Sequence, residues 1–156
     1  MLRNRAAWVP GRSDAQLKGC AFRSRVWRAI ADAEEFGAWF GAKLQGRFTP
    51  GARVQGPVTY PGYEHVTMDI TVERVEPERL FSFRWHPDAV EPGVDYSGEP
   101  TTLVEFHLEE VAGGTQLTVI ESGFDRIPLA RRAKAFRDNE AGWAGQVRNI
   151  ERHVSS

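Results

Sequence analysis

The sequence predicts a single α+β domain in which a curved antiparallel sheet wraps around a long C-terminal helix. Three observations lead to this prediction. Residues 43–123 alternate between apolar and polar side chains and are interrupted by Gly and Pro, which is typical of antiparallel strands joined by turns. Residues 131–154 repeat apolar side chains every three or four positions, as an amphipathic helix does. Two shorter helical patterns lie between residues 24 and 41.

The two short helices are expected to come before the main run of strands. Apolar side chains share one side at helical spacing after Ser24, which is a suitable N-cap. The second pattern, residues 34–41, has acidic residues in its first turn and ends at Gly41, and glycine commonly ends a helix. A strand around residues 16–22 would precede both helices.

Some six strands are expected after the helices, each with one apolar face. The clearest alternation lies in residues 64–75, 79–86 and 102–109. In the strand that follows, Glu121 falls on the same face as the apolar side chains, which is unusual for a carboxylate. The segment 87–100 is polar, rich in Pro and Gly and long for a hairpin, so it is expected to be a mobile loop or a lid.

The long C-terminal helix is expected to pack on the sheet through one stripe of side chains. This stripe consists of Phe136, Glu140, Trp143, Val147, Ile150 and Val154. The helix begins with a group of cations, where the helix dipole disfavours positive charge: Arg131, Arg132, Lys134 and Arg137. These cations would either pair with the acidic surface of the sheet or contact an acidic partner or ligand headgroup.

Composition narrows the classes of function. The chain has 156 residues, with 20 Lys and Arg against 21 Asp and Glu, so it lacks the strong basic charge of a dedicated nucleic-acid-binding protein. No run of eighteen apolar residues occurs, and no membrane insertion is expected. The single cysteine, Cys20, excludes an intrachain disulfide and favours the cytoplasm.

Charge and composition also suggest how the chain is organised. Residues 1–13 are irregular and are expected to be disordered, and residues 14–156 are expected to form one domain. The ends of the chain are basic and its middle is acidic, so the two could pair within one fold or between the subunits of a homodimer.

A long helix across a curved sheet leaves a hollow wherever the facing side chains do not interdigitate, and such a hollow is a natural site for a small molecule. The residues expected to line it are Trp39, Phe40, Tyr63, Phe81, Phe83, Trp85, Phe106, Val119, Glu121, Phe136, Glu140, Trp143 and Val147. The alternative for each aromatic ring is that it simply fills the core.

Two carboxylates, Glu121 and Glu140, are predicted to face the interior. An apolar cavity disfavours the charged form of a carboxylate, which is how general acids are made at neutral pH. The alternative is that Glu140 tilts out at the helix edge and that Glu121 lies in water at an open strand end. The four histidines lack the spacing of a metal site, and no nucleophile elbow or phosphate loop occurs, so neither a metal nor a cofactor is predicted.

Several stretches, taken in order, resemble one known superfamily over about residues 24–154. The chain is similar to the SRPBCC (START-like, helix-grip) superfamily, in the branch related to the activator of heat-shock-protein-90 ATPase. The resemblance implies a helix-grip fold whose cavity, between the C-terminal helix and the sheet, holds hydrophobic or amphipathic ligands such as lipids. This sequence departs from the family pattern at residues 20–24, which lack the proline that family members usually have there. The matching stretches are residues 26–30 through 39–41, 113–119, 121–124 and 139–143.

The resemblance leaves three functions open. The leading interpretation is a binding module for a small hydrophobic molecule. The second is an enzyme, because related folds carry cyclase, dehydratase and hydrolase chemistry in the same hollow; Glu121, Glu140 and Tyr63 would then be its acid–base residues. The third is a co-chaperone, which only the family name suggests. It is the weakest interpretation, because this chain is expected to supply one domain and the eukaryotic activators have an additional N-terminal chaperone-binding domain.

Overall fold

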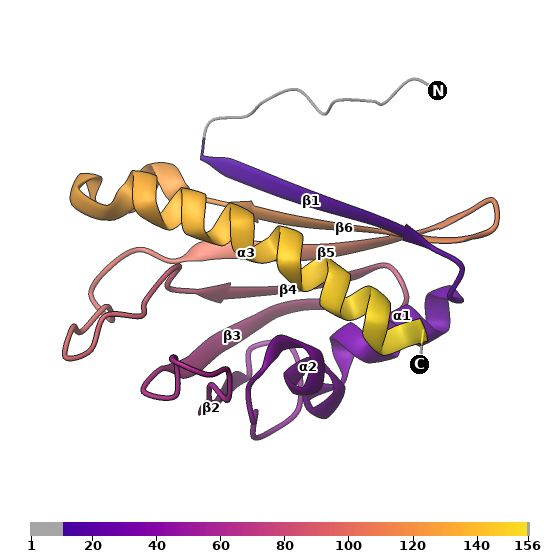
Figure 1. Cartoon of the computed structure of the whole chain (residues 1–156), viewed down its shortest axis with the longest axis horizontal. Coiled ribbons are helices and arrows are strands. Elements are labelled where there is room, and N and C mark those ends of the chain that lie inside the picture. Colours follow the sequence, from indigo (N-terminus) through magenta and orange to yellow (C-terminus); the bar gives the residue numbers. More distant parts are fainter. Residues whose placement is uncertain (1–10, 156) are drawn as a thin grey trace.

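The computed structural model describes residues 11–155, which form one six-stranded antiparallel sheet with a long helix across one face (Figure 1). The order of strands in the sheet is β1-β6-β5-β4-β3-β2. This arrangement confirms the predicted α+β architecture. The elements are β1 (Arg12–Gly19), α1 (Arg23–Ala31), α2 (Ala33–Phe40), β2 (Arg53–Pro57), β3 (Thr67–Glu76), β4 (Leu80–Trp85), β5 (Thr102–Val111), β6 (Gly114–Ser122), a 3-10 turn (Phe124–Arg126) and α3 (Leu129–Ser155).

The two short helices follow from local signals. The Asp32 side chain accepts a hydrogen bond from the Glu35 backbone N–H at 2.9 Å and caps α2. Gly41 ends α2 with φ +94°, a left-handed conformation that favours glycine. The N-cap of α1 is Phe22 rather than the predicted Ser24, because the Phe22 carbonyl already accepts from Val26 at 3.1 Å.

The first strand is longer toward the N-terminus than expected. β1 pairs antiparallel with β6 along its whole length, from Arg12 opposite Ser122 to Gly19 opposite Thr115. Residues 12 and 13 therefore belong to the sheet and not to a disordered segment. The strand overlaps the predicted residues 16–22 over residues 16–19, but it begins and ends earlier. Residues 1–10, the rest of the segment predicted to be disordered, lie outside the described residues.

Five strands follow the helices, where some six were expected. The segment after Gly41 makes only isolated bridges, in which Ala42 faces Val58 and Gln45 faces Gln55. No regular strand forms here, although the segment still crosses β2 closely. A Cβ atom on Gly56 would lie 1.8 Å from the Lys43 carbonyl oxygen, so glycine is required at that crossing.

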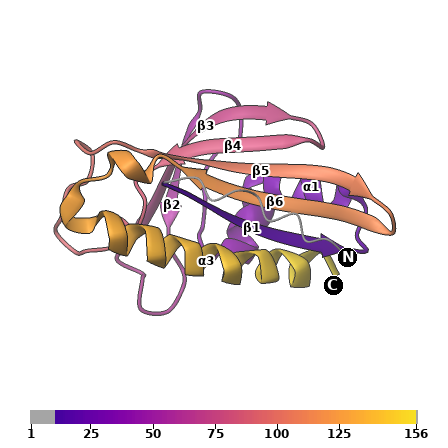
Figure 2. The ribbon, with the colours of Figure 1, turned by 90° about the horizontal axis from the view of Figure 1, so that it is seen from above.

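The helix α3 covers one face of the sheet, and Figure 2 shows it running along that face. Trp143, Val147 and Ile150 are buried against the core, as the helical stripe predicted. Phe136 packs elsewhere, with its ring centroid 5.3 Å from that of Phe124 in a separate small cluster. Within residues 11–155, no helix is long and apolar enough to span a membrane.

Candidate functional site

Glu121 on β6 is completely buried, and four neutral side chains donate hydrogen bonds to it. Its Oε1 accepts from Asn139 Nδ2 at 2.9 Å and from Trp143 Nε1 at 2.8 Å. Its Oε2 accepts from Trp85 Nε1 at 2.7 Å and from Thr102 Oγ1 at 2.5 Å. These contacts satisfy a buried carboxylate with two indoles, an amide and a hydroxyl, which lowers the cost of its desolvation.

Regular secondary structure brings the four donors together. Trp85 ends β4 and faces Thr102, the first residue of β5, across the ladder. Asn139 and Trp143 lie four residues apart and so share one face of α3. Glu121, on the inner face of β6, therefore links the end of β4 and the start of β5 to α3.

Both oxygens of Glu121 are occupied by donors from the protein itself. Each accepts at least two hydrogen bonds, so neither has free capacity for a substrate in this conformation. The geometry therefore gives Glu121 a positioning role. It fixes the orientation of the Trp85 and Trp143 rings that it holds.

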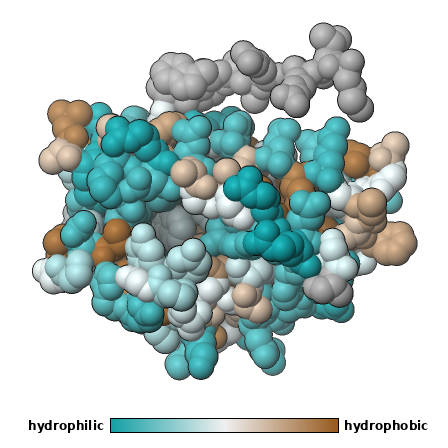
Figure 3. Space-filling view, in the orientation of Figure 1, coloured by the Kyte–Doolittle hydropathy of each residue, from teal (hydrophilic) through white to brown (hydrophobic). Residues whose placement is uncertain are grey.

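Three of the aromatic rings close to this carboxylate come from three different elements, and we call Phe40, Trp85 and Trp143 the aromatic trio. The ring centroids of Phe40 and Trp85 lie 6.1 Å apart, those of Phe40 and Trp143 lie 6.3 Å apart, and those of Trp85 and Trp143 lie 5.7 Å apart. Phe40 and Trp85 are half-buried, whereas Trp143 is 4% exposed. The face of the molecule that α3 crosses is mostly hydrophilic and is hollowed near its centre (Figure 3).

The structure divides the predicted ligand-binding residues into three groups. Phe40, Trp85, Glu121 and Trp143 come together at the contact between α3 and the sheet. The other central residues are buried in the core around them, where they pack on one another: Trp39, Phe81, Phe83, Phe106, Val119 and Val147.

Three of the predicted residues lie away from Glu121. Glu140 is exposed, so the prediction that it faces the interior is wrong; Asn139 faces inward instead, and one step along a helix turns a side chain by about 100°. Tyr63 is 45% exposed in the loop between β2 and β3, with its ring 6.0 Å from that of Tyr60. Phe136 belongs to the separate cluster around Phe124.

Thr102 and Asn139 are site residues that the sequence interpretation missed. Asn139 lies four residues before Trp143, so the helical spacing could have identified it. Thr102 offers no comparable signal, because its position depends on how β4 and β5 pair across a long loop.

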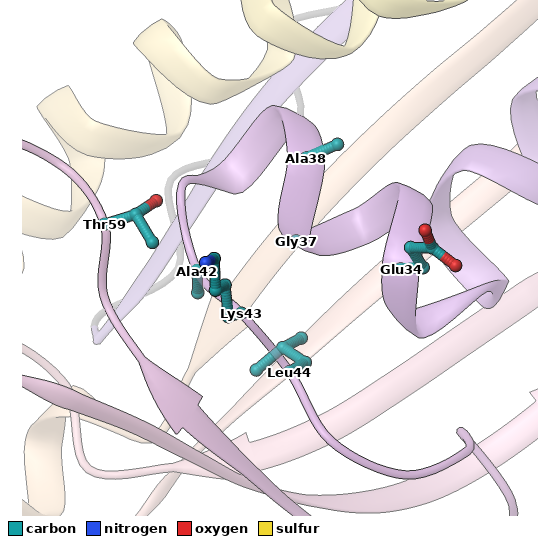
Figure 4. A pocket seen from close by; sticks show the side chains of 7 residues that line it. All are labelled: Glu34, Gly37, Ala38, Ala42, Lys43, Leu44 and Thr59. Atoms are coloured by element: carbon teal, nitrogen blue, oxygen red, sulfur yellow. The ribbon is translucent and has the colours of Figure 1, made fainter.

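A second hollow lies beside α2, away from Glu121. It has a volume of about 430 Å³ and is lined by Glu34, Gly37, Ala38, Ala42, Lys43, Leu44 and Thr59. Figure 4 shows that Thr59 and Glu34 lie at opposite ends of this groove, and α2 and the segment 42–44 that follows it form most of its wall. None of the Glu121 donors lines it, so it is a different place from the predicted cavity.

An antiparallel sheet that holds a long C-terminal helix, with aromatic side chains between them, defines the helix-grip class of proteins. A family model of Activator of Hsp90 ATPase homolog 1-like proteins matches residues 21–155. The chain therefore belongs to this family, as the resemblance implied.

Solved structures share this fold. A protein from Mesorhizobium loti is 20% identical with a TM-score of 0.73, and the match covers 92% of this chain and 96% of that one. A protein from Arthrobacter aurescens is 19% identical with a TM-score of 0.75, covering 93% and 86%.

A third solved structure, DynU16, is described as a protein in the dynemicin biosynthetic locus. It is 28% identical with a TM-score of 0.72, and the match covers 95% of this chain but 48% of DynU16. This chain thus spans about half the length of DynU16. No curated protein sequence matches this chain.

Proposed function

We propose that this protein is a cytoplasmic binding module that holds a small hydrophobic or amphipathic molecule against the aromatic trio. One observation carries the proposal: two partly exposed rings, Phe40 and Trp85, meet the buried ring of Trp143 beside a carboxylate that fixes both indoles. Ligand sites combine apolar walls with a few fixed polar groups in this way.

The arrangement is suited to binding because the rings are held before a ligand arrives. Trp85 and Trp143 each donate their indole N–H to Glu121, which restricts the orientation of both rings. Gln146 Nε2 donates to the Phe40 carbonyl at 3.2 Å and ties the end of α2 to α3. Prearranged side chains lose less conformational entropy on binding, so more of the contact energy appears as affinity.

The comparison with DynU16 supports a small organic ligand, since that protein is described by its place in a biosynthetic locus. Acid–base catalysis has less support. The oxygens of Glu121 are already occupied, and Glu140 and Tyr63, the other two acid–base candidates, are both exposed. We therefore favour binding over an enzymatic reaction.

The proposal is tested by titrating the protein with Nile red, an uncharged dye whose fluorescence rises in apolar surroundings. We expect about one dye per chain, and we expect Phe40→Ala to weaken binding about tenfold, the effect of losing about 1.4 kcal/mol of ring contact. Phe48→Ala is the matched control, because Phe48 is a buried ring that stacks on Phe81 outside the trio. No dye binding, or equal loss in both variants, would contradict the proposal.

A further inference from the structure

Residues 86–101, between β4 and β5, are anchored at both ends to the candidate site. Trp85, immediately before this loop, and Thr102, immediately after it, donate to the same oxygen of Glu121. The loop contains no helix or strand, so side-chain contacts determine its position. Movement of the loop therefore changes the surroundings of the aromatic trio directly.

Arg131 on α3 makes the first contact that holds the loop. Its guanidinium donates to Glu99 at 2.7 Å and 2.9 Å and to the Pro87 carbonyl at 2.7 Å. It also lies over the Tyr96 ring, 4.8 Å from the centroid. The Arg131 and Glu99 side chains are 19% and 23% exposed, so this contact is better shielded than an ordinary surface ion pair.

Asp88 and two residues of α3 make the second contact. Lys134 Nζ lies 3.3 Å from Asp88 Oδ2 and 2.6 Å from Asp138 Oδ2. Asp88 has φ +52° and a side chain that is only 14% exposed. A non-glycine residue retains such a conformation where surrounding contacts enforce it. Asp138 directly precedes Asn139, so this contact lies beside a donor to Glu121.

We propose that residues 86–101 form a lid at the edge of the aromatic trio, latched to α3 by Arg131 and Asp88, and that the latch tightens when Asp88 takes up a proton. This inference rests on the proposed binding function, because it names how access to the same site is regulated.

The direction of the pH effect follows from the surroundings of Asp88. Burial, together with the neighbouring Asp138, raises the pKa of Asp88 to about 6, and Lys134 opposes this shift. Below that pH, Asp88 is neutral and can donate to Asp138. Above it, two adjacent carboxylates are charged and share Lys134, so docking of the loop weakens as pH rises through about 6.

Other charged groups contact the lid or its latch and must be separated from Asp88. His65 Nε2 is 2.8 Å from the Val90 carbonyl oxygen, and His86 Nε2 is 3.0 Å from the Glu99 carbonyl oxygen. Arg137 acts on Asp138 through its charge. The test therefore removes the Asp88 carboxylate and leaves both imidazole rings in place.

The experiment measures the association rate of Nile red by stopped flow between about pH 5 and pH 7.5. For the unmodified protein, we expect the rate to rise on the order of tenfold with a midpoint near about pH 6, since about pH 5 lies one unit below the pKa of Asp88 and each unit corresponds to a factor of ten. Asp88→Asn, which mimics the neutral acid, should bind slowly at every pH. Arg131→Gln should bind rapidly at every pH, whereas Glu73→Gln, which removes a carboxylate paired with Arg84 elsewhere in the sheet, should behave like the unmodified protein.

Amide hydrogen exchange of residues 86–101 in the ligand-free protein, corrected for intrinsic exchange, gives a readout that needs no dye. Protection that falls above about pH 6, and that becomes independent of pH in Asp88→Asn, supports the latch. Protection that still depends on pH in Asp88→Asn overturns the latch, regardless of the result with Nile red. Exchange that follows this pattern in a protein that never binds the dye supports the latch and overturns the binding function.

Discussion

Glu121 and Glu35 are two of the carboxylates that attach α3 to the rest of the fold, and they do so in opposite ways. Glu121 contacts the middle of the helix, is fully buried and accepts only from neutral donors. Glu35, on α2, contacts the far end of the helix through His153 Nε2 at 2.9 Å. Glu35 also pairs with Arg25 and Arg28, each at 2.8 Å, and its side chain is 23% exposed.

The comparison shows what burial does to an interaction. At Glu35 burial alone would raise the pKa, but hydrogen bonds from His153 and Arg25 and the charges of Arg25 and Arg28 outweigh it and lower the pKa. The Glu35 side chain is partly exposed, so water can compensate in part for a lost partner. Glu121 is fully buried and out of reach of bulk water, so each lost contact leaves a polar group unsatisfied. The middle of α3 is therefore the part of the interface where side-chain identity matters most.

The largest effect is expected for Glu121→Leu, which keeps a similar volume and removes every acceptor. Four donors then lose their partner, two of them fully buried, and the free energy of unfolding should fall by about 3–5 kcal/mol. Urea unfolding measures this loss. A loss below about 1 kcal/mol would show that the four donors do not depend on the carboxylate.

Much of the fold was predictable from sequence because it depends on local periodicity. The alternation along β6 placed Glu121 on the inner face, and the stripe of α3 placed Trp143 against the sheet. The same stripe failed for Glu140, because a step of three or four residues cannot decide which edge of a helical face is covered. The Asn139 contact shows that the covered edge lies one residue earlier.

The sequence could not predict what surrounds Glu121. Its partners come from β4, β5 and α3, which are far apart along the chain, and their meeting depends on register between strands. The contacts between residues 86–101 and α3 were unpredictable for the same reason. The unfavourable cations at the start of α3 were visible in the sequence, but their pairing with Glu99 and Asp88 depends on where residues 86–101 fold back.

Trp143→Phe sharpens the comparison by removing one N–H and keeping most of the ring. We expect a loss of about 2 kcal/mol, because hydrogen bonds to charged acceptors contribute about 1.5–3 kcal/mol. The matched control is Trp39→Phe, which removes an indole N–H from the neutral Ala29 carbonyl and should cost about 1 kcal/mol. Equal losses would show that the charge on Glu121 adds nothing.

Glu35→Gln should cost about 1 kcal/mol or less, and the cost should shrink in high salt. Because folding lowers the pKa of Glu35, its contribution is present above about pH 4.5 and disappears as pH falls through the lowered pKa. Thermal unfolding across this range compares the variant with Glu34→Gln, an exposed carboxylate in the same helical turn. A cost that persists in acid would contradict the ion-pair account.

The smallest effect is expected for Glu140→Gln. Glu140 is exposed, and substitutions at such positions usually change stability by less than about 0.5 kcal/mol. Neither the unfolding midpoint in urea nor the affinity for Nile red should change measurably. A loss of stability comparable to that of Glu121→Leu would show that the Glu140 side chain is buried, which would contradict this account.

The central claim, that ligand binds where Glu121 holds the aromatic trio, is tested most directly by NMR of the indole N–H groups during titration with Nile red. Trp85 and Trp143 both donate to Glu121, whereas the buried Trp39 donates to Ala29 at 2.8 Å and meets the trio through Phe40, 5.9 Å away between ring centroids. We predict that the Trp85 and Trp143 resonances shift together, with saturation at one dye per chain, and that the Trp39 resonance shifts less than either. A saturating titration that leaves both Trp85 and Trp143 unmoved would contradict the claim.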